Sequence, residues 1–357
     1  MPETPRPSVF SRRSALALGL FALAGTATLS GCKSSATVGS AADFSTPLPS
    51  TVPSGTVLRV ADQYKLLQSA LELSGQLENV PYKIQWSAFT SGPAILEAFE
   101  GTSVDVGFIA DAPILVAQAA GRPIKIVGAV QGSKSASRVW SAPGSGITSG
   151  AQLRGKSIAF TEGTTLEVAA LQLLRNNNLT ASDVTFVKLS TPADILSAVG
   201  TGRADTGVLT EPLSSKFAGL YGPKGAVQLT DDKNLTSGLQ FLITRDAVDT
   251  SDATAAALRD LVTRFTKAEL WLGQHQQDWE QGYYVEVEQV SLAQAQTVVA
   301  AAGIPSIPSY AAASAELQQV ADLLTEYAVL PKKLDVAEDF DDRFDAVQQA
   351  AVASVGD

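Results

Sequence analysis

Short apolar runs alternate with amphipathic stretches along most of the chain. Residues 57–61 and 124–130 are apolar runs bounded by polar residues, as buried strands are. Residues 66–77 and 166–177 instead place their apolar side chains on one helical face. Strands that alternate with helices in this order usually join into parallel sheets through right-handed crossovers. The pattern therefore predicts an α/β protein with helices packed on two parallel-type sheets.

A stretch of this pattern occurs twice, with an offset of 100 residues. Residues 90–113 read as a helix, a short strand and the start of a second helix, and residues 190–212 repeat that order. The shared positions include Asp105 and Asp205, Gly107 and Gly207, Ile95 and Ile195, and the acidic pair Asp111 and Glu211. Two copies predict two similar lobes, each with a strand that ends at an acidic residue.

The rest of the chain fits around these two lobes. A turn-rich break at 143–146 marks the crossover into the second lobe, 226–229 reads as a further strand of that lobe, and 239–244 carries the chain back. From residue 253 the periodicity is helical. The expected division is a signal peptide at 1–31, a lipidated flexible tether at 32–55, lobe 1 at 56–143 and 239–335, lobe 2 at 144–238, and an acidic, solvated C-terminal tail at 336–357.

The N-terminal segment has the layout of an export signal. Arg12 and Arg13 precede an apolar run at 15–29, which is too short for a comfortable membrane span. The run ends in the sequence LSGC, and Cys32 is the only cysteine of the chain. This ending resembles a bacterial lipobox, in which the cysteine carries the lipid. Export through the general or the twin-arginine route stays open.

Composition and charge narrow the function. The chain has 357 residues, 45% of them apolar, which suffices for two cores of ordinary size. Its 26 basic and 36 acidic residues give a net charge of -10, and it has no basic stripe, so nucleic-acid binding is disfavoured. If the ligand is an anion, the overall field opposes it. Local dipoles and a few polar groups must then bind it.

Candidates for catalysis are few. His275 is the only histidine, and we expect it to be a packing or surface residue of a C-terminal helix. With Cys32 assigned to the lipid, no thiol is left for a nucleophile, and no P-loop or Rossmann glycine pattern is present. We expect no catalytic residue, no metal and no cofactor. Among the tryptophans, Trp140 is the one that could line a binding site.

Polar turns follow the predicted strands, and they suggest a binding site. In open parallel sheets, ligands bind beyond the carboxyl ends of the strands, where helix N-termini offer backbone N–H groups to an anion. Each turn could equally be an ordinary helix cap, and Asp111 and Glu211 fit that role better than contact with an anion. The turns that qualify are Asp62-Gln63, Ser91-Gly92, Ala110-Asp111, Gly163-Thr164-Thr165 and Thr210-Glu211.

Taken together, the chain resembles the substrate-binding lipoproteins of ABC importers, within the nitrate, taurine and aliphatic-sulfonate group. The resemblance runs from about residue 57 to 336 and rests on residues 86–93 (WSAFTSGP), 104–107 (VDVG), 111–113 (DAP), 117–121 (AQAAG) and 330–336 (LPKKLDV). It implies a two-lobed periplasmic-binding-protein-like fold of type II, with a hinge crossover and C-terminal helices. The ligand-binding positions it implies are Gln63, Ala110, Asp111, Thr164, Thr165, Thr210, Glu211 and Gln240, and the strand-end argument adds Ser91 and Gly92.

The resemblance also implies a function. The protein would be a monomeric receptor on the outer face of the cell membrane, held there by lipid on Cys32, that delivers a sulfonate-type anion to a permease without chemistry. Tyr64-Lys65-Leu66 and Thr210 depart from the group's pattern, which leaves room for a bulkier or aromatic sulfur compound. Taurine, nitrate or a pyrimidine-type solute remain alternative ligands. A non-transport enzyme on the same fold, or a sensing or adhesive surface protein, remains an alternative function.

Overall fold

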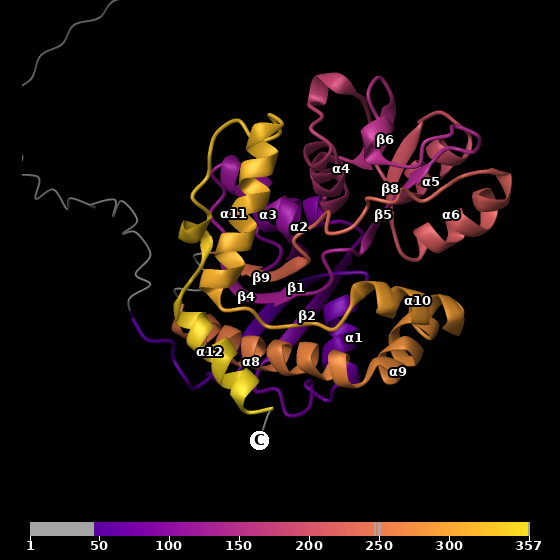
Figure 1. The fold of residues 1–357 in the computed structure, drawn as a ribbon. Helices are drawn as coiled ribbons and strands as arrows, with labels where there is room; N and C mark the ends of the chain where they lie inside the picture. The colour runs from indigo at the N-terminus through magenta and orange to yellow at the C-terminus, as the bar shows by residue number, and fades with distance from the viewer. Residues whose placement is uncertain (1–45, 246–247, 249–250, 356–357) are drawn as a thin grey trace, which may run out of the picture. The chain divides into compact units, whose positions relative to one another are not determined.

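The computed structural model describes residues 46–245, 248 and 251–355. The predicted signal peptide at 1–31 and Cys32 lie outside these residues, so both stay predictions. The described residues belong to one compact unit that contains two β-sheets (Figure 1). None of the helices in the described residues combines the length and the apolar character that a membrane span requires.

The first sheet has five strands in the order β2-β1-β3-β9-β4. Their bounds are β1 Val57–Gln63, β2 Lys83–Phe89, β3 Val106–Ala110, β4 Lys125–Gln131 and β9 Leu239–Thr244. β1 is parallel to β2 and β3, whereas β9 is antiparallel to both β3 and β4. The sheet is therefore mixed. Its one reversed strand is the segment that returns to it from the second sheet.

The second sheet has four strands in the order β5-β8-β6-β7. Their bounds are β5 Ser137–Ser141, β6 Ser157–Thr161, β7 Thr185–Leu189 and β8 Thr206–Thr210. β6 is parallel to β7 and β8, and β5 is antiparallel to β8. The expected division at residue 143 assigned β5 to the first lobe, but β5 pairs with β8 in the second sheet. The strand expected at 226–229 does not form, because only Gln228 makes a bridge, to Trp140.

Two segments connect the sheets and run side by side. The outgoing segment lies between β4 and β5, and the returning segment precedes β9. Gly132 N–H donates to the Gly238 carbonyl at 2.9 Å, and Asn234 N–H donates to Ser135 Oγ at 2.9 Å. The paired segments form the hinge crossover that the sequence predicts.

Helices cover both sheets. Before β9 these are α1 Leu66–Leu73, α2 Gly92–Glu100, α3 Asp111–Ala119, α4 Thr165–Asn176, α5 Pro192–Gly200 and α6 Leu213–Tyr221. After β9 the chain is helical, with α8 Asp252–Gln274, α9 Gln276–Trp279, the π-helix η4 Glu280–Val285, α10 Leu292–Ala302, α11 Tyr310–Glu326 and α12 Arg343–Ala353. α8 and α12 lie against each other beside the first sheet (Figure 1).

The repeated glycines allow a helix to pack closely on each sheet. A Cβ atom at Gly107 would lie 2.9 Å from Ile95 Cγ2 of α2, and one at Gly207 would lie 2.8 Å from Ile195 Cγ2 of α5. Both distances are shorter than van der Waals contact, so a larger residue would push the helix away. The repeat therefore encodes one helix-on-strand contact in each lobe.

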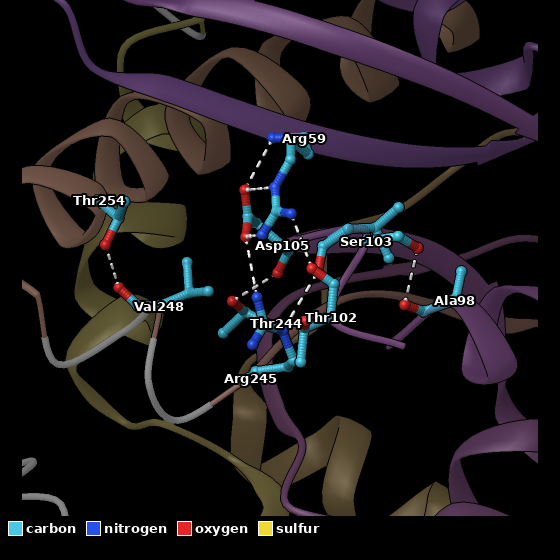
Figure 2. A network of polar contacts seen from close by, with 10 residues as sticks. Arg59, Ala98, Thr102, Ser103, Asp105, Thr244, Arg245, Val248 and Thr254 are labelled. Atoms are coloured by element: carbon cyan, nitrogen blue, oxygen red, sulfur yellow. Dashed lines mark hydrogen bonds and ion pairs between the residues drawn. The ribbon is translucent and has the colours of Figure 1, made fainter. Parts of the chain in front are cut away.

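The repeated aspartates tie neighbouring strands together. The Asp105 carboxylate accepts the backbone N–H of Arg59 in β1 at 3.0 Å, and the Asp205 carboxylate accepts that of Ser157 in β6 at 2.8 Å. Figure 2 shows that Asp105 also pairs with the guanidinium groups of Arg59 and Arg245. The same position thus fixes the start of the neighbouring strand in both lobes.

The acidic segment at the C-terminus is folded, which corrects the expectation of a solvated tail at 336–357. α12 buries Phe344 completely, and the Gln348 side chain bonds both the N–H and the carbonyl of Ala129 in β4. Asp341 is also buried and pairs with Arg343. The acidic composition of this segment did not indicate that it also has an apolar face, which covers the first sheet.

Part of the expected tether also contacts the folded unit. Residues 46–55 contain no helix or strand, but Leu48 and Val52 pack against the core. The Thr46 carbonyl accepts a hydrogen bond from Arg343 at 3.3 Å. The rest of the expected tether, 32–45, lies outside the described residues.

Candidate functional site

The carboxyl ends of β1, β2 and β3 meet at one edge of the first sheet, because the three strands run parallel. Gln63 ends β1, Ser91 and Gly92 follow β2, and Ala110 ends β3. Gln240 lies in the same place because it pairs with Ala110 across β3 and β9. The structure therefore gathers the predicted residues of the first lobe along one edge.

The predicted residues of the second lobe lie at the matching edge of the other sheet. Thr164 and Thr165 follow β6 and begin α4, while Thr210 ends β8 and Glu211 follows it. β6 and β8 are parallel neighbours, so both turns leave the sheet on the same side. Each lobe thus presents polar turns at strand ends, as the sequence predicts.

The first turn of α3 connects the two edges. Thr165 Oγ1 of the second lobe donates to Asp111 Oδ1 of the first at 3.4 Å. Gly92, which begins α2, lies so close to the same turn that a Cβ atom there would be 2.7 Å from Pro113 Cγ. The N-termini of α2 and α4 therefore both contact the first turn of α3. Thr210 and Glu211 are one strand further along, on β8.

Internal carboxylates already accept hydrogen bonds from backbone N–H groups in or next to several of the predicted turns. Asp62 accepts from the backbone N–H groups of Leu67 and Gln68 in α1, at 3.1 and 2.8 Å. Glu167 accepts from Gly163 N–H at 2.7 Å, and Glu211 accepts from Ser215 N–H at 3.0 Å. A carboxylate next to these amides opposes the approach of a second anion. Glu211 therefore accepts a hydrogen bond from the first turn of its own helix, α6, as the capping interpretation predicts.

Two helices at the junction of the two edges, around the first turn of α3, have neutral caps instead. Ser91 accepts from Ala94 N–H at 3.4 Å at the start of α2, and Thr164 accepts from Leu166 N–H at 3.2 Å at the start of α4. The first N–H groups of a helix have no partner within it, and the amides of Gly92 and Thr165 are such groups. The dipoles of both helices favour an anion near the α3 turn, whereas the carboxylates of Glu167, in the first turn of α4, and of the buried Asp111 oppose it.

The threonine hydroxyls at α4 are already used within the protein. Thr164 Oγ1 donates to the Thr161 carbonyl at 2.7 Å while it caps the helix. Thr165 Oγ1 donates to Asp111. An anion at this helix would therefore contact the backbone amide of Thr165 more readily than either hydroxyl.

Asp111 holds the junction together from inside. Its side chain is fully buried, and it accepts hydrogen bonds from Ala112 N–H at 2.7 Å, from Thr165 Oγ1, and from the Ser237 hydroxyl of the returning crossover. Burial raises the pKa of Asp111, while these donors act in the opposite direction. Its partners come from α3, α4 and the hinge, so the residue links both lobes and is not accessible as a direct ligand contact.

A second buried carboxyl, Asp62, lies beneath the first-strand edge. Burial raises its pKa to about 6, although the N–H groups of Gln68 and Leu67 oppose that rise. The group is therefore charged at neutral pH and becomes protonated in mild acid. Its charge stabilises the start of α1, which follows the turn at Tyr64 and Lys65.

The other candidates for chemistry have structural surroundings. His275 ends α8, its ring stacks on Trp271 with 4.7 Å between ring centroids, and its Nδ1 lies 3.1 Å from the Trp271 carbonyl. Trp140 is buried against Phe217, and its Nε1 donates to Ser214 Oγ at 3.0 Å, so it does not offer an open wall. In the described part of the chain, no group of three or more His, Cys, Asp or Glu side chains could hold a metal ion.

A pocket of about 330 Å³ lies next to the hinge, away from the predicted site residues. Its walls come from α4, α11 and both crossover segments. Lys134 and Glu316 form an ion pair of 2.7 Å in its lining, and Ser237, the partner of Asp111, also lines it. The pocket therefore touches the junction from the hinge side.

Sequence reasoning missed two residues of this region. Ser237 bonds Asp111 although it is 126 positions away, and no short-range pattern could have paired them. Tyr64 was noted only as a departure from the family pattern, but it is 46% exposed at the carboxyl end of β1. Its backbone has a positive φ of 56°, a conformation that Lys65 shares with 59°.

The chain is similar in sequence to known proteins over most of its length. Residues 94–270 match the family described as NMT1/THI5 like. A curated aliphatic sulfonates-binding protein of Escherichia coli (strain K12) is 29% identical over 79% of this chain and 87% of its own length.

Two solved structures share the fold at somewhat lower identity. The alkanesulfonate-binding protein SsuA of Xanthomonas axonopodis pv. citri, bound to MOPS, is 26% identical with a TM-score of 0.69 over 81% of this chain and 99% of its own. The periplasmic aliphatic sulphonate binding protein SsuA of Escherichia coli is 27% identical with a TM-score of 0.67 over 80% and 92%. The two mixed sheets are thus those of a periplasmic-binding-protein fold, as the sequence predicts.

Proposed function

Because the chain is an NMT1/THI5-like substrate-binding protein with distant homology to the aliphatic sulfonate-binding proteins, we propose that it captures a sulfonate-type anion between its two lobes. The ligand would be an alkane or aryl sulfonate or a related organosulfur compound. The observation that carries the proposal is the pair of helix N-termini with neutral cap residues, α2 and α4, that both contact the α3 turn.

A sulfonate suits these donors better than a carboxylate-rich or cationic ligand would. Its three oxygens can each accept a hydrogen bond, and the N–H groups of Gly92 and Thr165 supply partial positive charge without a mobile cation. Ser91, Ala110, Gln63, Thr210 and Gln240 line the two edges around this point and would contact the rest of the solute. A chain with a net charge of -10 requires such local attraction.

The surroundings of the protein belong to the same proposal. Cys32 would carry the lipid that holds the receptor at the outer face of the cell membrane, and the permease of an ABC importer would receive the solute from the closed form. The receptor would act as a monomer, with no cofactor and no chemical step.

Direct binding tests the proposal. Isothermal titration of the purified protein with taurine, an alkanesulfonate, an arylsulfonate, a sulfate ester and nitrate should give saturable heat with at least one sulfonate. Nitrate is the control, because it is an anion with a planar head and no sulfur. Heat with nitrate alone would move the protein to a different ligand class, and no heat with any of these anions would contradict the anion site itself.

Lipid attachment needs a separate experiment. Expression in a bacterial host with a radiolabelled fatty acid should label the wild-type chain and leave the Cys32→Ser variant unlabelled. A labelled variant, or a wild-type chain that takes up no label, would contradict the anchor without affecting the binding proposal.

A further inference from the structure

Tyr64 combines three properties that seldom occur together on a surface residue. It is the only aromatic side chain among the large, exposed hydrophobic residues of the described chain, with 46% of its surface accessible. It lies directly after Gln63, at the carboxyl end of β1. Its positive φ is rare for a bulky residue. Such a conformation is kept only where the surrounding structure enforces it, and it is most frequent at functional sites.

Contacts on both sides hold the Tyr64 backbone in place. Its N–H donates to the carbonyl of Phe89 at 3.1 Å, and its own carbonyl accepts a hydrogen bond from the Tyr283 hydroxyl at 3.1 Å. Tyr283 is buried and stacks on Trp279, with 4.4 Å between ring centroids and 6° between ring planes. Tyr64 is therefore fixed by a packed aromatic pair from α9 and η4.

These contacts also place the backbone of Tyr64 beside the end of β2, which leads to the proposed ligand site. Phe89 is the last residue of β2, and the neutrally capped turn Ser91-Gly92 begins two residues later. Gln63, the preceding residue, bonds the Thr90 carbonyl of the same turn at 3.5 Å. The backbone of Tyr64 is thus bound directly to the strand that leads into the α2 N-terminus.

We propose that Tyr64 is a specificity-determining residue of this site and that it selects aromatic sulfonates by stacking its ring on the ring of the ligand. This inference rests on the proposed sulfonate function. The helix amides would bind the sulfonate group of any ligand, whereas Tyr64 would contact the group attached to sulfur. Because its backbone is already fixed, little conformational entropy is lost when an aromatic ligand stacks on it.

A pair of ligands with the same head group and ring size isolates this effect. Benzenesulfonate and cyclohexanesulfonate both present a sulfonate on a six-carbon ring, and only the first is flat and aromatic. Aromatic pairs add about 0.5–1.5 kcal/mol beyond area burial, and this is about a 2- to 13-fold change in affinity. We expect the wild-type protein to prefer benzenesulfonate over cyclohexanesulfonate by about fivefold in isothermal titration.

Variants at Tyr64 test the assignment. Tyr64→Phe keeps the ring and should keep the preference, whereas Tyr64→Leu keeps apolar bulk without a ring and should bring the affinity ratio close to one. Val57→Ala, at an exposed apolar residue at the opposite end of β1, is the remote control and should leave the ratio unchanged. Thermal melts of each variant confirm that the fold is retained.

The outcomes separate this inference from the proposed function. If Tyr64→Leu retains the wild-type ratio while both ligands still bind, the role of Tyr64 is refuted and the sulfonate function stands. The same holds if the wild-type protein binds both ligands equally well. If the wild-type protein binds no sulfonate at all, the proposed function fails and this inference fails with it.

Discussion

The amide of Thr165 can be removed without breaking the helix that carries it. Thr165 is the first residue of α4, where proline is well tolerated because its missing N–H has no partner within the helix. Thr164 precedes it with φ -126° and ψ 169°, an extended conformation that a following proline accepts. Thr165→Pro should therefore leave α4 folded while it deletes one proposed donor to the anion.

The expected loss follows from the kind of hydrogen bond. A bond to a charged group contributes about 1.5–3 kcal/mol, so the variant should bind its sulfonate about 10- to 100-fold more weakly. Thr165→Pro also removes the hydroxyl that donates to Asp111, and Thr165→Val is the matched control because it loses that hydroxyl and keeps the amide. We expect Thr165→Val to stay within about threefold of wild type, since the bond it loses is long at 3.4 Å.

Isothermal titration of the three proteins with one sulfonate, together with thermal melts, decides the question. If Thr165→Pro binds as tightly as wild type while its melt is unchanged, the α4 amide is not a ligand donor. If Thr165→Val loses as much affinity as Thr165→Pro, the hydroxyl or its bond to Asp111 is responsible, and the helix-amide account is wrong.

Three further predictions concern stability. Burial raises the pKa of Glu269 in α8 to about 8 from an ordinary value of 4.5, so the free energy of unfolding should fall as pH rises between these values. Glu269→Gln should remove this loss and gain about 3 kcal/mol over wild type between pH 5 and pH 7.5 in urea denaturation. An identical pH dependence of the two proteins would show that folding does not raise the pKa of Glu269. Gly207→Ala would place a Cβ 2.6 Å from Val199 and should cost about 1–3 kcal/mol, whereas Gly219→Ala in α6, with open space around it, should be neutral or stabilising in the same assay. Burial acts to raise the pKa of Asp105, but the hydrogen bonds and charges of its arginine partners outweigh that effect and lower the pKa. Asp105→Asn should therefore reduce the free energy of unfolding by about 2 kcal/mol at pH 7, and the difference from wild type should shrink as the pH falls below about 4. A difference that stays constant with pH would contradict the ion-pair account.

The sequence predicted the main elements because their signals are local. Apolar runs such as 57–61 and 124–130 gave the strands, and the offset of 100 between Asp105 and Asp205 predicted two similar lobes. The position of β5 and the folded C-terminal segment could not be predicted in this way. Both depend on long-range contacts, such as Gln348 with Ala129 of β4, and such contacts produce no periodic pattern in the sequence.

The candidate site was likewise predictable from the sequence only in part. Residues at strand ends, such as Gly92 and Thr165, follow from topology, because parallel strands end at one edge. Which helix N-termini lie close together does not follow, because it depends on long-range contacts such as the bond of Thr165 to Asp111. The sequence predicted a set of possible donors, and the folded chain brings those of α2 and α4 to the same turn, at the start of α3.

A crystal structure of the protein with a bound alkanesulfonate would test the central claim most directly. The account predicts sulfonate oxygens within about 3 Å of the backbone nitrogens of Gly92 and Thr165, with the carboxylate of Asp111 outside hydrogen-bond distance of the sulfonate. A sulfonate bound elsewhere, such as in the pocket between α4 and α11, with both amides left unoccupied, would contradict it.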